Sequence, residues 1–200
     1  RRNFFDLDGT LTDPKEGITG CIQYALECLG APVPEQDELT WCIGPSLLES
    51  FAHLVSVEHA AQAVEHYRQR FSTVGLFENR LYPDIPSVLA RLNEYDQPLY
   101  VASSKPLVFV DRILRHFQLD RYFQQTFGSG LDGSLTDKAE LLAFAGSLTG
   151  HDLSQCLMVG DRSHDAAGAA SQGMDFIGAL YGYGCEDEYR RHGYTRWANQ

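Results

Sequence analysis

The feature that most constrains the fold is a regular alternation of short apolar segments and helix-like segments over residues 82–200. Strands are expected at 99–102, 125–128, 156–160 and 175–179, and helices at 83–93, 106–117, 137–148, 163–172 and 186–192. One more buried strand is expected at Asn3–Leu7. Strands that alternate with helices form βαβ units with right-handed crossovers, so the strands run parallel and helices cover both faces. The sequence therefore predicts an α/β fold with a doubly wound parallel sheet.

The stretch between the first strand and this alternation has a different pattern. Apolar side chains recur there at helical spacing, as at Ile18, Ile22 and Leu26, until Gly30 ends the first helix. Further helices are expected at 47–54 and 60–71, and there is no strand signal before Leu99. This change of pattern predicts an all-helical domain over residues 15–79, inserted into a core made of residues 1–14 and 80–200.

The composition excludes several classes of protein. Hydrophobic residues make up 44% of the 200 residues, enough for a folded core, and no apolar run reaches the ~18 residues of a membrane span. The net charge of −11 argues against nucleic-acid binding, although a local group of cations can still bind a small anion. Five scattered cysteines without metal-site spacing indicate reduced thiols in a cytoplasmic protein. Monomer and homodimer both stay open.

Reactive side chains follow three of the expected strands. Asp6 and Asp8 end the first strand, residues 103–105 (Ser-Ser-Lys) come directly after 99–102, and Asp161 and Asp165 come after 156–160. In an open parallel sheet the ligand binds beyond the carboxyl ends of the strands. If the three strands are neighbours, these groups form one site.

Four carboxylates in one place would need a compensating cation. Two carboxylates ~4 Å apart repel each other by about 4 kcal/mol at an effective dielectric constant near 20. Mg²⁺ suits such a cluster best, because it binds through a few carboxylates, water and substrate phosphate. No group of histidines is placed to favour zinc.

Each of these residues also has a purely structural interpretation. The acids and Ser103 and Ser104 could cap turns or helices, and Lys138 could be an exposed lysine on its helix. The arrival of acid, hydroxyl, amine and acid in order at one edge of a predicted sheet favours a functional site over several separate caps.

The chain resembles the haloacid dehalogenase-like hydrolase superfamily along nearly its full length. The resemblance is carried by DLDGTLTD at 6–13, by Ser103, by Lys138 and by GDRSHD at 160–165. FDLDGTLTDPKEGI at 5–18 and the Ile-Gly-Pro turn at 43–45 are most similar to the phosphoglycolate phosphatase and 5′-nucleotidase branch. The resemblance implies a Rossmann-like core with a helical cap at 15–79.

The resemblance also implies roles for the acids. Asp6 would attack phosphorus and form an aspartyl-phosphate, and Asp8 would act as general acid and then as general base. Mg²⁺ would be held by Asp6, Asp161 and the main-chain carbonyl of Asp8, while Asp165 would bind it through water or orient its ligands.

The remaining implied roles concern the substrate. Ser103 would donate a hydrogen bond to the phosphoryl group, Lys138 would offset the charge that develops on it, and Thr10 would brace the nucleophile loop. Ser104 and Lys105 are further candidate substrate contacts. A lysine near a helix start is an equally good interpretation of Lys105.

The function predicted from these residues is Mg²⁺-dependent hydrolysis of a small phosphorylated metabolite, with phosphoglycolate, nucleoside monophosphates and sugar phosphates all open. A dehalogenase or phosphonate-cleaving relative lacks the second acid, which is present here as Asp8. A mutase of the β-phosphoglucomutase kind keeps both acids and stays an alternative, as does a non-catalytic phosphate-binding or scaffold protein. The GxGxxG at 128–133 is weak evidence for a dehydrogenase, since it does not follow the first strand.

Overall fold

The computed structural model describes all 200 residues of the chain. They form two compact units, one of residues 1–13 and 81–200 and the other of residues 14–80. The chain therefore leaves the first unit after Asp13 and returns to it at Leu81. Two short strands, β2 (Thr12–Asp13) and β3 (Arg80–Leu81), lie at these two crossings.

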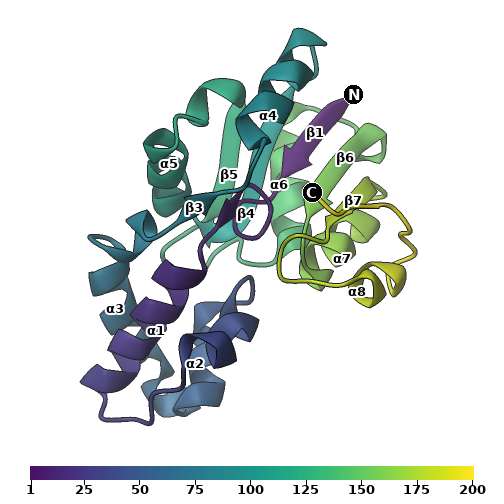
Figure 1. Cartoon of the computed structure of the whole chain (residues 1–200). Coiled ribbons are helices and arrows are strands. Elements are labelled where there is room, and N and C mark those ends of the chain that lie inside the picture. Colours follow the sequence, from purple (N-terminus) through teal and green to yellow (C-terminus); the bar gives the residue numbers. More distant parts are fainter. The chain divides into compact units, whose positions relative to one another are not determined.

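The first unit contains a six-stranded sheet in which all neighbouring strands run parallel. The strand order is β5-β4-β1-β6-β7-β8, with β4, β1 and β6 adjacent near its middle (Figure 1). The strands are β1 (Arg2–Phe5), β4 (Leu99–Pro106), β5 (Gln125–Ser129), β6 (Cys156–Gly160), β7 (Asp175–Ala179) and β8 (Trp197–Ala198).

Helices connect these strands and cover the sheet. From β1 the chain moves outward to β4 and β5, then returns past β1 to β6 and continues to β7. Right-handed crossovers therefore place α4 and α5 on one face and α6 and α7, which contact each other, on the opposite face. The helices are α4 (Ile85–Glu94), α5 (Leu107–His116), α6 (Lys138–Thr149), α7 (Ser163–Ser171) and α8 (Glu186–Arg190), with 3-10 turns η3 (Asp120–Tyr122) and η4 (Leu153–Gln155).

One hydrophobic core cluster lies between the sheet and the α6–α7 layer. Three aromatic rings from neighbouring strands pack side by side there: Phe4 stacks on Tyr100 at 4.9 Å between ring centroids, and Phe127 lies 6.4 Å from each. Leu141 and Leu142 of α6 join this cluster, and all five side chains are buried. The apolar positions of the strands thus fasten the sheet to the helices and leave the strand ends for polar residues.

The prediction of a doubly wound parallel sheet is confirmed, with corrections at strand ends, the smallest of which extends β5 by one residue to Ser129. β1 ends at Phe5 rather than at Leu7, and β4 continues through residues 103–106 instead of ending at Ala102. The extension occurs because Ser103 still pairs with Gly128 and, after a shift in register, Pro106 pairs with Ser129. Main-chain pairing does not require apolar side chains, so the polarity of residues 103–105 was a misleading end signal.

The second unit consists only of helices and their connections. Its α-helices are α1 (Lys15–Cys28), α2 (Leu47–Leu54) and α3 (Val57–Phe71), with 3-10 turns η1 (Gln36–Cys42) and η2 (Gly75–Phe77). Helix α1 packs on α3, and α2 packs on α3 as well. Buried side chains such as Ile22, Leu26 and Phe51 form its interior. In neither unit is there a helix with the length and apolar composition needed to cross a lipid bilayer.

Candidate active site

The carboxyl ends of β4, β1 and β6 bring the predicted groups together. Asp6 and Asp8 follow β1, Ser103 lies in β4, and Asp161 and Asp165 follow β6; all five are buried. The direction in which the chain travels across the sheet reverses between β1 and β6. In open α/β sheets the ligand crevice forms beside such a reversal, and the acids lie there.

A tight loop after β1 holds Asp6 and Asp8. The Asp6 amide donates to the carbonyl of Val159 in β6 at 2.9 Å, and the Gly9 amide donates to the carbonyl of Thr12 at 2.8 Å. Gly9 has φ +79°, and a Cβ there would overlap the carboxylate of Asp161. A glycine at this position is therefore required both by the turn and by the close approach of the second acid.

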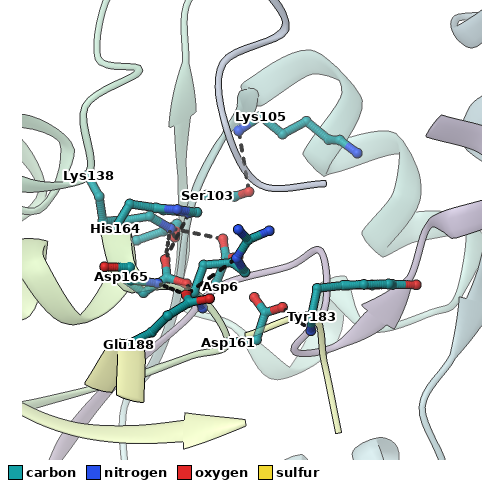
Figure 2. Close-up of polar contacts among 12 residues, drawn as sticks. Asp6, Ser103, Lys105, Lys138, Asp161, His164, Asp165, Tyr183 and Glu188 are labelled. Atoms are coloured by element: carbon teal, nitrogen blue, oxygen red, sulfur yellow. Dashed lines mark hydrogen bonds and ion pairs between the residues drawn. The ribbon is translucent and has the colours of Figure 1, made fainter. Parts of the chain in front are cut away.

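Lys138 bridges two of the acids from the start of α6. Its Nζ lies 2.9 Å from Oδ1 of Asp6 and 2.8 Å from Oδ1 of Asp165, and it donates to the carbonyl of Ala102 at 2.7 Å (Figure 2). Gly168 of α7 allows this placement, because a Cβ there would lie 2.7 Å from Cγ of Lys138. Burial disfavours the charged lysine, but Asp165 and Asp6 outweigh it and raise the pKa of Lys138.

The acids differ in their charge balance. Burial raises the pKa of Asp6 to about 7, with Asp165 and Asp8 adding to the rise and Lys138 opposing it. Burial also raises the pKa of Asp161 well above its usual value, and the charges of Asp165 and Asp6 raise it further. For Asp165, burial is outweighed by Lys138, so its pKa is lowered. Without a further cation, the site holds Asp165 charged and disfavours the charged forms of Asp6 and Asp161.

A second lysine pairs with the other acid of the loop. Nζ of Lys105 lies 2.6 Å from Oδ2 of Asp8, and both side chains are nearly buried. The Lys105 amide donates to Oγ of Ser103 at 3.4 Å, so the serine and the lysine of β4 are linked locally (Figure 2). Neither interpretation of Lys105 from the sequence included this ion pair with Asp8.

Thr10 and Ser104, the other two candidate residues, form no ion pair or hydrogen bond with the acids. Thr10 is fully buried in the loop, and its Oγ1 has no hydrogen-bond partner. Ser104 is half-buried in β4 and makes no hydrogen bond with the acids.

The donor set fits a hard divalent cation. Four buried carboxylates meet two ammonium groups, which leaves a formal charge of −2 when all are ionised. Asp161 has no lysine partner, and Oδ1 of Asp161 and Oδ1 of Asp8 are both buried without a hydrogen bond. Oxygen ligands of this kind suit Mg²⁺.

One histidine also lies beside the acids. His164 offers a ligand atom within 4.8 Å of those of Asp6 and Asp165, and burial lowers its pKa. Lys138 already contacts both of these acids, whereas Asp161 has no lysine partner, so the need for a further cation is greatest at Asp161 and not at this histidine.

Sequence reasoning missed the segment that supports Asp161. The amide of Tyr183 donates to Oδ2 of Asp161 at 2.7 Å, and the phenol of Tyr189 donates to its main-chain carbonyl at 2.8 Å. Gly182 and Gly184 flank Tyr183 and lie so close that a Cβ at either would overlap Asp161. The available signal was the Tyr-Gly-Tyr-Gly run just after β7, the strand next to β6.

One family model and several individual proteins match most of the chain. The haloacid dehalogenase-like hydrolase family model matches residues 4–179. A 5′-nucleotidase of Pseudomonas aeruginosa is 47% identical over 195 residues, which cover 96% of this chain and 88% of that protein. The tyrosine-protein kinase PtkA of Mycobacterium tuberculosis is 40% identical over 92% of this chain, which spans only 63% of that kinase.

A solved structure extends the agreement to the whole fold. The crystal structure of a predicted phosphatase from Clostridium acetobutylicum superposes with a TM-score of 0.95 at 37% identity. The match covers 100% of this chain and 94% of that one.

Proposed function

The chain belongs to the haloacid dehalogenase-like hydrolase family, and from this membership we propose that it is a Mg²⁺-dependent phosphatase that hydrolyses a small phosphomonoester through a phosphorylated Asp6. The observation that carries the proposal is the pairing of Lys138 with Asp6 and Asp165 beside Asp161. A buried carboxylate oriented by a fixed ammonium group can act as a nucleophile, and the ammonium also offsets charge on a bound phosphoryl group.

The reaction divides into two displacements at phosphorus. In the first, an oxygen of Asp6 forms a bond to phosphorus while the ester oxygen leaves and takes a proton from Asp8. In the second, water attacks phosphorus, Asp8 accepts its proton, and the bond to Asp6 breaks to release phosphate. Nζ of Lys105 holds Asp8 in place, by a hydrogen bond to the protonated acid in the first step and by an ion pair with the carboxylate before the second.

Asp6, Asp161 and the main-chain carbonyl of Asp8 would hold Mg²⁺, which supplies positive charge beside the phosphoryl oxygens. Asp165 is already bound by Lys138 and by the amide of Arg162, so it orients the other groups.

Several residues complete the phosphate site in this proposal. Ser103 donates from β4 to a phosphoryl oxygen, and Thr10 braces the loop. Ser104 is the weakest candidate because it makes no hydrogen bond with the acids. Lys105 acts on the substrate indirectly, because it holds Asp8, which transfers the protons.

We assign the choice of substrate to the helical unit, which would act as a cap domain made of residues 15–79. We favour a nucleoside 5′-monophosphate as the substrate class because the 5′-nucleotidase relative is 47% identical. Phosphoglycolate is the next candidate. The protein is expected to act in the cytoplasm, as a monomer or homodimer, without binding nucleic acid.

Phosphotransfer to a protein tyrosine is a second candidate, favoured by the 40% identity to PtkA over 92% of this chain. A phosphorylated Asp6 can pass its phosphoryl group to a hydroxyl other than that of water. Transfer to a sugar phosphate, as in a mutase, would use the same step.

The test is release of inorganic phosphate from a panel of nucleoside 5′-monophosphates, phosphoglycolate, sugar phosphates and p-nitrophenyl phosphate, with Mg²⁺, Ca²⁺ or EDTA. We expect release with Mg²⁺ and strong inhibition by Ca²⁺, which takes more ligands in looser geometry. Full release in EDTA would exclude the metal from the mechanism. A parallel assay supplies labelled ATP and a tyrosine-containing protein; labelled phosphotyrosine without phosphate release from the panel would favour the kinase.

A further inference from the structure

Residues 181–184, Tyr-Gly-Tyr-Gly, form a segment that contacts the acid loop at several points. The phenol of Tyr181 donates to the main-chain carbonyl of Thr10 at 2.9 Å. The phenol of Tyr183 donates to the carboxylate of Asp13, and its amide donates to Oδ2 of Asp161. The segment therefore binds the loop after β1 at Thr10, the strand β2 that follows it at Asp13, and one of the acids after β6.

Close packing makes these contacts possible. A Cβ on Gly182 would overlap the carbonyl of Gly9 and the side chain of Asp161, and a Cβ on Gly184 would overlap the carbonyl of Asp161. Neither Gly182 nor Gly184 has a positive φ. Glycine is thus needed here for space and not for backbone conformation, which indicates that the close approach itself matters.

Tyr183 bonds two acids at once, Asp13 through its phenol and Asp161 through its main-chain amide. Burial and the neighbouring Asp13 raise the pKa of its phenol. The hydroxyl therefore stays protonated and donates a hydrogen bond to the carboxylate of Asp13. Its amide occupies one oxygen of Asp161, while Oδ1 of Asp161 stays buried without a hydrogen bond. An acid with one oxygen fixed by a main-chain donor presents the other in a defined direction.

We propose that Tyr183 is a positioning residue for Asp161: its phenol, anchored on Asp13, holds its amide against one carboxylate oxygen so that the other can bind Mg²⁺. This inference rests on the proposed metal site. Asp13 is also the last residue before the chain enters the helical unit. The side chain of Tyr183 is therefore bonded to the residue at which the chain leaves the α/β unit.

The test is the dissociation constant for Mg²⁺ of the full chain without substrate, by titration calorimetry, in Tyr183→Phe and in the control Tyr194→Phe. Tyr194 is also half-buried, and its phenol donates to the carbonyl of Met174 at 2.7 Å, away from the acids. Loss of a residue that orients a metal ligand weakens metal binding about 10-fold or more, so we expect that loss in Tyr183→Phe and an unchanged constant in Tyr194→Phe. The melting temperatures of the metal-free variants check that both fold.

Asp13→Ala should weaken Mg²⁺ binding as Tyr183→Phe does, and the double variant should be no weaker than either single one, because all three remove the same bond. Wild-type affinity in Tyr183→Phe, or equal weakening in Tyr194→Phe, would overturn the inference. Should Tyr183→Phe fail to fold, Asp13→Asn and Asp13→Ala decide: retained affinity in Asp13→Ala contradicts the inference. If the wild type binds no Mg²⁺, the proposed metal site is wrong and this role falls with it.

Discussion

The α/β unit and the helical unit differ in what their interiors contain. All five buried charged side chains of the protein lie in the α/β unit, whereas the buried polar side chains of the helical unit are only Thr19 and Ser50. Buried charges that are not fully compensated oppose folding. The α/β unit therefore maintains an electrostatically unfavourable cluster that its fold does not need, which is the mark of a functional site.

The three lysines of the chain show the same difference. Side chains of Lys138 and Lys105, in the α/β unit, are 1% and 8% exposed, and each pairs with a buried acid. Lys15, in the helical unit, is 37% exposed and pairs with the exposed Asp37. If the contrast between the units is real, substitutions among the buried charges of the α/β unit should alter catalysis, metal binding or the charge balance, and substitutions in the interior of the helical unit should lower stability and leave metal binding unchanged.

The largest effect is expected for Asp6→Asn. An amide cannot replace the carboxylate as nucleophile, so the rate of phosphate release should fall at least about 1,000-fold, while the similar size of the side chain preserves the fold. Initial rates and melting temperature measure the two properties. The control is Asp175→Asn, an exposed acid of the same unit, which should stay active. Appreciable residual turnover in Asp6→Asn would rule out this nucleophile.

Lys138→Met should have the next largest effect, on stability. It leaves Asp6 and Asp165 without their shared cation, and removal of one partner of a buried ion pair costs about 3–5 kcal/mol of unfolding free energy. Urea denaturation in Mg²⁺-free buffer measures the loss. Lys105→Met, which affects one acid that is slightly more exposed, should cost less. A smaller loss of unfolding free energy for Lys138→Met than for Lys105→Met would contradict the charge balance of the site.

In the helical unit, Leu26→Ala should lower the unfolding free energy by about 3 kcal/mol, because it removes a fully buried side chain and leaves a cavity. The dissociation constant for Mg²⁺, measured below the melting temperature, should not change. A large loss of metal affinity in this variant would show that the two units are not separable in this way.

The smallest effect is expected for Lys15→Gln. An exposed ion pair contributes little to stability, so neither the melting temperature nor Mg²⁺ binding should change measurably. A clear drop in either would show that Lys15 does more than pair with Asp37 on the surface.

Much of the fold could be predicted because its signals are local. β6 and β7 have the predicted bounds, as does α2, since each is an uninterrupted apolar or amphipathic run of typical length. The short strands β2, β3 and β8 were not predicted. Two residues cannot display a periodicity, and such strands form only because a partner lies beside them.

The candidate site shows the same division. That Asp6 and Asp161 would lie together could be predicted, because the carboxyl ends of parallel strands share an edge once β1 and β6 are neighbours. The pairing of Lys105 with Asp8 and the contacts of Tyr183 could not be predicted. Each depends on the path of a loop or on a shift of register, and no local pattern records either.

The sequence by itself determined the order of strands and helices and the set of groups at the strand ends, because periodicity and turn residues act within a few positions along the chain. Only the tertiary structure decided which lysine meets which acid, and that Asp161 has no lysine at all. The lysine–acid distances follow from strand register, from glycines that permit close approach and from contacts between residues up to 132 positions apart. The protonation of each side chain then depends on the charges that the fold brings beside it.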